Sequence, residues 1–212
     1  MIVLGLTGSI GMGKSTTAAM FAEAGARVLD SDAVVHGLYA QDGAAVGPVG
    51  RAFAGVVSGG AVDRQVLAAR IAEDPGALER LETIVHPLVA QARDAFLDRA
   101  RADGTAVAVL DIPLLFEVGQ DAVVDAVVVV SADPLVQRER VLARPGMTPD
   151  RLDALLKRQL PDAEKRARAD FLVDTGNGHD AARAEVRRIL ATVQDPAWRP
   201  RRPLASPGEA SH

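Results

Sequence analysis

Five short runs of hydrophobic, mostly β-branched residues recur along the chain and predict the strands of its core. They are Ile2–Leu6, Arg27–Leu29, Ala106–Leu110, Ala126–Val130 and Phe171–Val173. Such nearly unbroken apolar runs are typical of strands that are buried on both faces of a parallel sheet. Segments of mixed polarity separate most of them, which predicts a three-layer α/β core in which helices cover the sheet.

The interval between the second and the third run is long and lacks a strong strand. Four segments in this interval have a helix-like sequence: Asp32–Tyr39, Arg64–Glu73, Pro75–Ile84 and Pro87–Arg101. Open parallel sheets bind ligands at the carboxyl ends of their strands, and the chain leaves the sheet at such an end. We therefore expect residues 32–104 to form an all-helical, ligand-binding insertion, and residues 1–31 and 105–194 to form the nucleotide-binding core.

Two later segments differ from the core in composition. Thr148–Lys165 is a polar helical stretch that follows a first helix at Leu135–Arg144, and we expect it to form a lid at about residues 145–168. The stretch from Asp195 onward is rich in proline, arginine and serine and poor in apolar residues. A segment of this kind buries too little apolar surface to order itself, so we predict a disordered tail over residues 195–212.

Charge and composition exclude several classes of partner. The formal net charge is -4 and aromatic residues make up 3% of the chain, so neither nucleic acid nor an anionic membrane is an expected partner. The longest apolar run is too short to span a bilayer, and no secretory signal is visible at the amino terminus. The chain has no cysteine, which excludes disulfides and thiolate metal sites. We expect a cytoplasmic protein that is a monomer or a weak homo-oligomer.

The first functional pattern is a complete GxxxxGK[ST] phosphate-binding loop at Gly8–Ser15, between the first strand and a helix at Ser15–Glu23. Its glycines allow the backbone N–H groups to turn toward a polyphosphate, and the helix N-terminus adds its positive dipole end. Lys14 can reach the β- and γ-phosphates, and the hydroxyl of Ser15 can ligate Mg²⁺. We therefore predict that the chain binds ATP. The predicted nucleotide-binding positions are Gly8, Gly11, Met12, Gly13, Lys14, Ser15 and Thr16.

Acidic residues follow the second and the third apolar run. Asp32 is a candidate base that accepts the proton of an alcohol during phosphoryl transfer, although it can equally cap the helix that starts at Ala33. Asp30 is a candidate for supporting the strand end or a metal-bound water. Asp111 resembles the strand-end acid that often supports Mg²⁺ in phosphate-loop enzymes. The stretch that follows Asp111, Pro113–Phe116, can instead be pure core.

Basic residues cluster on the predicted helix Leu135–Arg144. Arg140 and Arg144 are four residues apart, so they share one helix face and can converge on a polyanion. The alternative is an exposed, charged helix, which is the interpretation we favour for Arg138. Arg166 and Arg168, which belong to the patch Lys165–Arg168, can also be only a solvated face. His86 precedes Pro87 at a predicted helix start, and no second ligand stands at metal-binding spacing from it.

Taken together, these motifs resemble the dephospho-CoA kinase family over about residues 2–178. The segments that carry the resemblance include TGSIGMGKST (7–16), Asp30–Asp32, Asp63-Arg64, Leu81-Glu82, His86-Pro87, IPLLFE (112–117), Gln137 with Arg140 and Arg144, Gln159, Lys165 and Ala169-Asp170. One departure lies after the last strand. The family usually has Asp-Asn-x-Gly there, near the adenine of ATP, whereas this chain has Asp174 followed by Thr175–Gly178.

The resemblance implies transfer of the γ-phosphoryl group of ATP to the 3′-hydroxyl of the ribose of dephospho-CoA, the last step of coenzyme A biosynthesis. It also implies a phosphate-loop core, a helical insertion that binds the CoA substrate and a mobile lid. Asp32 would be the base, Lys14 the phosphate clamp and Arg140 the arginine that stabilises the transferring charge. The residues that would line the acceptor site are Arg64, His86, Leu114, Leu115 and Glu117.

Two other functions are open on the residues alone. The first is another small-molecule phosphate-loop kinase, such as a nucleoside monophosphate, shikimate or gluconate kinase, which would share the loop and a strand-end acid. The second is a nucleotide-dependent switch, which would need a water-positioning residue and a partner surface, and neither is evident.

Overall fold

A computed structural model of the chain describes residues 1–200, and it divides into two compact units. Unit 1 comprises Met1–Val28 and the chain from Ala100 onward, and unit 2 comprises Leu29–Arg99. Unit 2 overlaps the insertion predicted at residues 32–104. Its role in binding the substrate stays a prediction.

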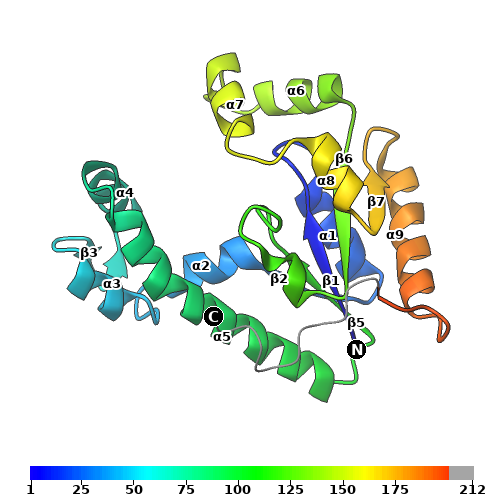
Figure 1. Ribbon diagram of the computed structural model, residues 1–212, viewed down its shortest axis with the longest axis horizontal. Helices are drawn as coiled ribbons and strands as arrows, with labels where there is room; N and C mark the ends of the chain where they lie inside the picture. The colour runs from blue at the N-terminus through cyan, green and yellow to red at the C-terminus, as the bar shows by residue number, and fades with distance from the viewer. Residues whose placement is uncertain (201–212) are drawn as a thin grey trace. The chain divides into compact units, whose positions relative to one another are not determined.

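The main sheet has five strands in the order β2-β5-β1-β6-β7 (Figure 1). The strands are β1 (Ile2–Thr7), β2 (Arg27–Asp30), β5 (Val107–Asp111), β6 (Ala126–Ser131) and β7 (Phe171–Asp174). β1 pairs in parallel with both β5 and β6, and β6 pairs in parallel with β7. Leu6 faces Asp111 across the β1–β5 pair, so the carboxyl ends of these strands meet at one edge of the sheet. The predicted strands and the predicted α/β class are confirmed.

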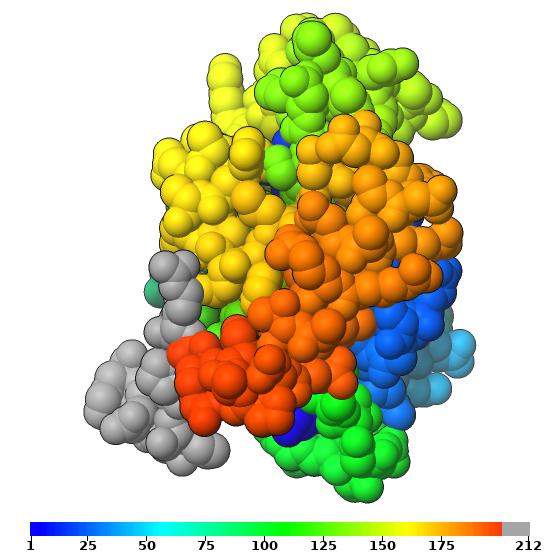
Figure 2. Space-filling model, turned by 90° about the vertical axis from the view of Figure 1, so that its right-hand side faces the viewer, coloured from blue at the N-terminus to red at the C-terminus, as the bar shows by residue number. Residues whose placement is uncertain are grey.

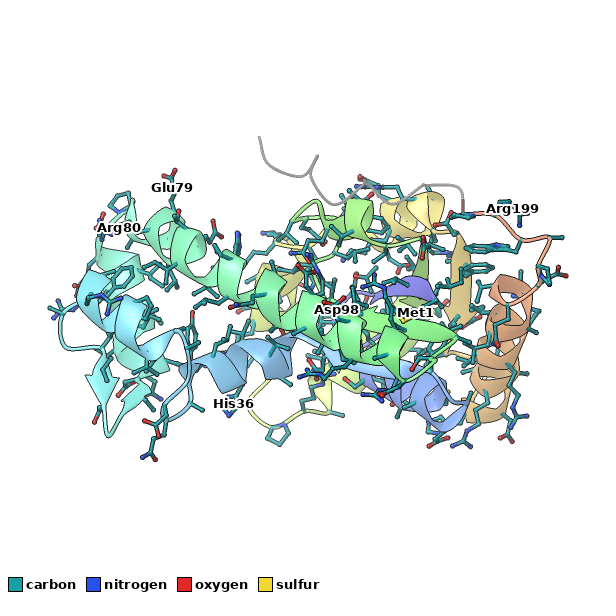
Figure 3. The ribbon with its side chains drawn as sticks, turned by 90° about the horizontal axis from the view of Figure 1, so that it is seen from below. Met1, His36, Glu79, Arg80, Asp98 and Arg199 are labelled. Carbon is teal, nitrogen blue, oxygen red and sulfur yellow. The ribbon has the colours of Figure 1, made fainter. Side chains whose placement is uncertain are left out.

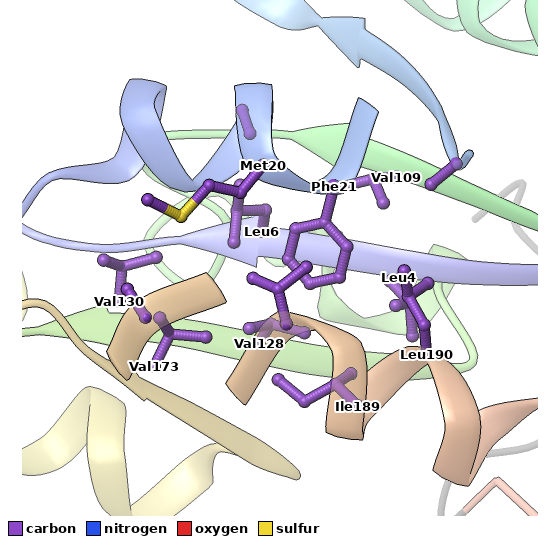
Figure 4. Close-up of a cluster of buried hydrophobic side chains, with 14 of the residues drawn as sticks. Leu4, Leu6, Met20, Phe21, Val109, Val128, Val130, Val173, Ile189 and Leu190 are labelled. Atoms are coloured by element: carbon purple, nitrogen blue, oxygen red, sulfur yellow. The ribbon is translucent and has the colours of Figure 1, made fainter. Parts of the chain in front are cut away.

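A large hydrophobic core lies between this sheet and two helices, α1 (Lys14–Glu23) and α9 (His179–Val193) (Figure 4). Leu4 and Leu6 of β1 are fully buried in it, as are Phe21 of α1 and Ile189 of α9. Because every second residue of β1 points to this side, the pattern of the strand decides which residues anchor the two helices. The two elements that flank the phosphate loop, β1 and α1, are therefore anchored in this core.

The described part of unit 1 also contains α6 (Pro134–Leu142), α7 (Pro149–Leu156), α8 (Asp162–Arg168) and a short 3-10 turn, η1 (Gln120–Val123). α6 contacts α7, and α8 contacts β6. Figure 2 shows the face of the molecule on which α8, in yellow, and α9, in orange, reach the surface.

Unit 2 consists of helices and one small hairpin. Its elements are α2 (Ser31–Tyr39), α3 (Val46–Ala52), β3 (Val57–Ser58), β4 (Ala61–Val62), α4 (Arg64–Glu73) and α5 (Ala77–Ala102), the last of which runs on into unit 1. A separate hydrophobic core forms around Val49, Phe53 and Leu67. At its edge, Arg80 of α5, labelled in Figure 3, lies over the ring of Phe53 and forms an ion pair of 2.7 Å with Asp74.

The hairpin corrects the prediction of an all-helical insertion. Val57 pairs with Val62 and Ser58 with Ala61, around a turn at Gly59 and Gly60. Two adjacent glycines between β-branched residues are a hairpin signal, so this element was predictable.

The structure also corrects the prediction that one helix ends before His86-Pro87 and another begins there. The two predicted helices, Pro75–Ile84 and Pro87–Arg101, form the single helix α5 with Pro87 inside it. Proline removes one helical hydrogen bond and usually breaks or kinks a helix. Here apolar residues on both sides of Pro87, including Val85 and Leu88, pack into the same core, which keeps the two halves in one helix. His86 therefore lies within the helix and not at its start.

The predicted helix Thr148–Lys165 is likewise two helices, α7 and α8. Thr148 caps α7 by accepting a hydrogen bond from Arg151 N, and Pro161 precedes the first residue of α8. A proline disfavours helical backbone at the residue before it, which explains the break. The predicted tail begins within the described residues, where Trp198 packs against the core of unit 1. The rest of that predicted tail, residues 201–212, lies outside the described residues.

Candidate functional site

The phosphate loop connects β1 to α1 and ends at the first residue of the helix. Gly13, with φ of 90°, is the N-cap of α1, and it provides no side chain to cap the helix. The first N–H groups of α1 therefore lack a side-chain acceptor, and such a helix start attracts anions. Gly8 passes close to β6, where an added Cβ would lie 2.6 Å from the carbonyl oxygen of Val130. The first glycine of the motif is thus required by packing and not only by a ligand.

Lys14 lies at the first position of α1 and pairs with Asp111. Its Nζ atom donates a hydrogen bond to Oδ1 of Asp111, at the carboxyl end of β5. The two side chains are 16% and 4% exposed, so the pair is largely shielded from water. The structure thus joins two sequence-predicted site residues, the phosphate lysine and the strand-end acid.

Two glutamines hold the phosphate loop at Ile10. Gln137 of α6 donates a hydrogen bond of 2.8 Å from Nε2 to the carbonyl oxygen of Ile10. Gln159, between α7 and α8, accepts a hydrogen bond of 3.1 Å at Oε1 from Ile10 N. Both polar groups of the Ile10 backbone are thus bound by side chains from other elements. The sequence predicted no structural role for these glutamines, because their separation from the loop, 127 and 149 residues, gives no local signal.

Arg140 and Arg144 line one pocket of about 190 Å³ beside the phosphate loop. This placement agrees with the predicted convergence of the two arginines. Arg138, by contrast, is exposed and lies 3.6 Å from Asp153 of α7, as expected for a solvated residue. The other residues that line the pocket are Gly11, Gly13, Thr16, Thr17, Met20, Thr175, Gly178, His179 and Ala182. They come from the loop, α1, the segment after β7, and α9.

Asp30, and not Asp32, caps α2. The Oδ1 atom of Asp30 accepts hydrogen bonds from the backbone N of Asp32 at 2.9 Å and of Ala33 at 3.0 Å. The alternative role considered for Asp32, a helix cap, is therefore filled by its neighbour. Asp32 lies in the first turn of α2 with an exposed side chain, where its carboxylate is available to a ligand.

The other predicted acceptor residues of unit 2 are also exposed. Arg64 is the first residue of α4, directly after the N-cap Asp63, and His86 lies in α5. The positive charge of Arg64 interacts electrostatically with the hydroxyl group of Tyr39. Burial raises the pKa of Tyr39, and Arg64 partly offsets that rise. The positions of Arg64 and His86 leave both side chains accessible, and their roles in binding stay predictions.

The remaining predicted acceptor residues lie in the segment after β5. They are Leu114, Leu115 and Glu117. Leu115 is fully buried and packs beneath Gly5, where an added Cβ would lie 2.9 Å from its Cδ1 atom. It is thus a core residue, which corrects its predicted place at the acceptor surface. Leu114 is 39% exposed and remains accessible to a ligand.

Glu117 anchors the predicted lid to the core. Its Oε1 atom accepts a hydrogen bond of 2.8 Å from Leu160 N and lies 2.8 Å from Nζ of Lys165, a side chain that is 0% exposed. Burial by itself raises the pKa of a carboxyl group, but the ion pair with Lys165 and the hydrogen bond from Leu160 N outweigh it, so the pKa of Glu117 lies below its ordinary value. Lys165 is therefore a buried member of the patch Lys165–Arg168 and not part of a solvated face.

We expect this ion pair to make the stability of the fold depend on pH. Because the pKa of Glu117 is lower in the folded chain than in the unfolded chain, its contribution is present above the ordinary value of 4.5 and is lost as the pH falls through the lowered pKa. Glu117→Gln would also leave the buried Lys165 cation without its carboxylate. The free energy of unfolding at pH 7 should therefore fall by about 3 kcal/mol.

Urea denaturation at several pH values measures this difference. The gap between the wild type and Glu117→Gln should narrow as the pH is lowered below 4.5. Glu164→Gln, an exposed position on α8, is the matched control and should change stability by less than about 0.5 kcal/mol. An unchanged urea midpoint for Glu117→Gln at pH 7 would show that the pair contributes nothing.

Within residues 1–200, no three His, Cys, Asp or Glu side chains are grouped as metal ligands. Mg²⁺ is usually held by one or two protein oxygens together with phosphate oxygens and water. Ser15, exposed in the first turn of α1, offers one such oxygen. In the same part of the chain, none of the helices combines the length and the apolar character needed to cross a membrane.

Comparison with known proteins identifies similar chains over most of this length. The model of a family described as dephospho-CoA kinase matches residues 2–181. A dephospho-CoA kinase of Rhodopseudomonas palustris is 58% identical over 190 residues, which cover 90% of this chain and 94% of the relative. The crystal structure of TT1252 from Thermus thermophilus has 33% identity and a TM-score of 0.77, covering 90% of this chain and 96% of that one. The dephospho-CoA kinase from Campylobacter jejuni has the same coverage with 20% identity and a TM-score of 0.60, and it supports the fold alone.

Proposed function

Because the chain belongs to the dephospho-CoA kinase family, its reaction is the transfer of the γ-phosphoryl group of ATP to dephospho-CoA, and we propose which of its residues perform that reaction. The oxygen of the ribose 3′-hydroxyl forms a bond to the γ-phosphorus, the bond from that phosphorus to the β–γ bridging oxygen breaks, and ADP and coenzyme A are the products. Phosphoryl transfer of this type depends on positioning and on stabilisation of charge.

The donor side of the reaction is carried by the phosphate loop and Lys14. The observation that supports it most is the start of α1, where no side chain caps the helix and Lys14 stands at its first position. The loop N–H groups bind the phosphates, and Lys14 moves from Asp111 to the β- and γ-phosphate oxygens. Arg140 and Arg144, which line the same pocket as Thr16, add positive charge where the polyphosphate binds.

Mg²⁺ would be held by the hydroxyl of Ser15, with Asp111 as a support for its water ligands. When bound, the ion neutralises charge on the β- and γ-phosphate oxygens. A hydroxyl and a carboxylate are hard oxygen donors, which is the chemistry that this ion requires.

The acceptor side requires a base, and we assign that role to Asp32. Since Asp30 provides the cap of α2, the carboxylate of Asp32 is not needed to start the helix. Asp32 orients the 3′-hydroxyl and accepts its proton as the bond to phosphorus forms. Arg64, His86 and Leu114 bind other parts of dephospho-CoA, consistent with their exposure.

An acceptor-dependence assay tests this function. With ATP and Mg²⁺ present, we expect ADP to form when dephospho-CoA is added, at a kcat of about 1–100 s⁻¹, as is usual for kinases. AMP, shikimate and gluconate, the acceptors of the alternative kinases, should give no such turnover. Equal loss of ATP with and without any acceptor would contradict the proposal and favour a nucleotide-dependent switch.

A further inference from the structure

Thr175 joins Arg140 to the phosphate loop. Its Oγ1 atom accepts a hydrogen bond of 2.8 Å from Nη1 of Arg140 and donates one of 2.7 Å to the carbonyl oxygen of Met12. Its own carbonyl oxygen accepts a second hydrogen bond of 2.8 Å from Nη2 of Arg140. Three parts of the chain that are far apart in sequence, the loop, α6 and the segment after β7, thus meet at this one residue.

The surroundings of Thr175 determine which hydrogen bonds its hydroxyl group makes. The residue is 9% exposed, and its backbone N donates a hydrogen bond of 3.0 Å to the carbonyl oxygen of Ser131. A hydroxyl group has a single proton to donate. That proton goes to Met12, because the alternative acceptor, the carbonyl oxygen of Ser131, is 3.5 Å away. The lone pairs of Oγ1 are therefore left to face Arg140.

The loop itself packs against the same side chain. A Cβ added at Gly13 would lie 3.2 Å from both Cγ2 and Oγ1 of Thr175. The methyl group and the hydroxyl group of Thr175 are therefore both used, the first as a surface under the loop and the second as a hydrogen-bonding group. Neither role is visible in the sequence, where Thr175 stands only as a departure from the usual family pattern.

The two hydrogen bonds fix the plane of the Arg140 guanidinium group. An arginine has five N–H donors in a rigid fork. Among residues 1–200, Arg140 donates only to Thr175, so its remaining N–H groups are available on the side of the pocket that it shares with Thr16 and Arg144. An arginine held in this way needs no rearrangement before it binds a phosphate oxygen.

We propose that Thr175 is a positioning residue, which holds the Arg140 guanidinium against the phosphate loop in the orientation that stabilises the transferring phosphoryl group. This inference rests on the proposed function, in which Arg140 adds positive charge where the polyphosphate binds. Thr175 acts through Arg140, so its contribution should disappear when Arg140 is absent.

A double-mutant cycle tests that dependence. Thr175→Val keeps the shape of the side chain and removes the hydroxyl group, and it should lower kcat about tenfold, with the KM for dephospho-CoA unchanged. In an Arg140→Ala background the same substitution should lower kcat by no more than about twofold. Thr175→Ser, which keeps the hydroxyl group, should restore kcat to within about threefold of the wild type. Thr192→Val, which removes a hydroxyl group bound to Arg188 O in α9, is the matched control.

Two results would overturn the proposal. One is an equal loss of kcat for Thr175→Val in both backgrounds, which would mean that Thr175 does not act through Arg140. The other is a loss that Thr175→Ser fails to restore. The Kd for ATP without acceptor separates this inference from the proposed function. It is measured by titration calorimetry for the four members of the cycle: the wild type, Thr175→Val, Arg140→Ala and the double variant. Coupling between the two residues in ATP binding, together with no turnover of dephospho-CoA, would refute the kinase assignment and support the link between Thr175 and Arg140.

Discussion

Lys14→Ala is expected to lower kcat at least about a hundredfold, because it removes the cation that meets the β- and γ-phosphates as charge moves between them. The measurement is steady-state turnover at saturating ATP and dephospho-CoA. Lys157→Ala, at an exposed lysine between α7 and α8, is the matched control and should retain near-normal turnover. Normal turnover in Lys14→Ala would refute the assignment of the phosphate clamp.

The structure predicts a second effect of this substitution and a way to separate the two. Asp111 is 3% exposed, so the loss of its Lys14 partner leaves a buried carboxylate with one cation fewer. The thermal stability of Lys14→Ala should therefore fall. Adding Asp111→Asn removes that negative charge and should recover stability without recovering turnover. If turnover returned together with stability, the loss would be one of folding and not of catalysis.

Asp32→Asn should lower kcat by about 10² to 10⁴, since the amide cannot accept the proton of the 3′-hydroxyl. The KM for ATP should change little, because Asp32 is not assigned to the donor side. The measurement is steady-state turnover, first with dephospho-CoA and then with ATP as the variable substrate.

Asp30→Asn is the matched control for this substitution. It removes the same charge two residues away, and asparagine caps helices as well as aspartate does, so α2 should keep its start. Near-full kcat in Asp32→Asn would show that another group takes the proton. An equal loss in both variants would point to the start of the helix and not to proton transfer.

Local patterns were enough to predict the core of the fold. The strands follow from runs of apolar residues, and the phosphate loop follows from four spaced positions between a strand and a helix. The strand β5, for example, was predicted as Ala106–Leu110 and is observed as Val107–Asp111. Patterns of this kind are read correctly because burial on both faces leaves little choice of residue.

Features that depend on distant contacts were predicted less well. Pro87 reads as a break, and only the shared packing of Val85 and Leu88 shows that the helix continues through it. For Leu115 the sequence leaves two interpretations open, a core residue or, by resemblance, a residue of the acceptor site, and only its packing beneath Gly5 decides for the core. Among the described residues, the link from Thr175 to Met12 spans 163 positions, and no window along the chain could have revealed it.

The hydrogen bonds that Gln137 and Gln159 make to Ile10 have a consequence for the entropy of nucleotide binding. Both polar groups of that loop residue are bound by side chains of the protein itself. The conformational freedom of this part of the loop is therefore lost when the protein folds and not when ATP arrives. Because the second glutamine belongs to the segment between α7 and α8, the order of the loop also depends on the order of the predicted lid.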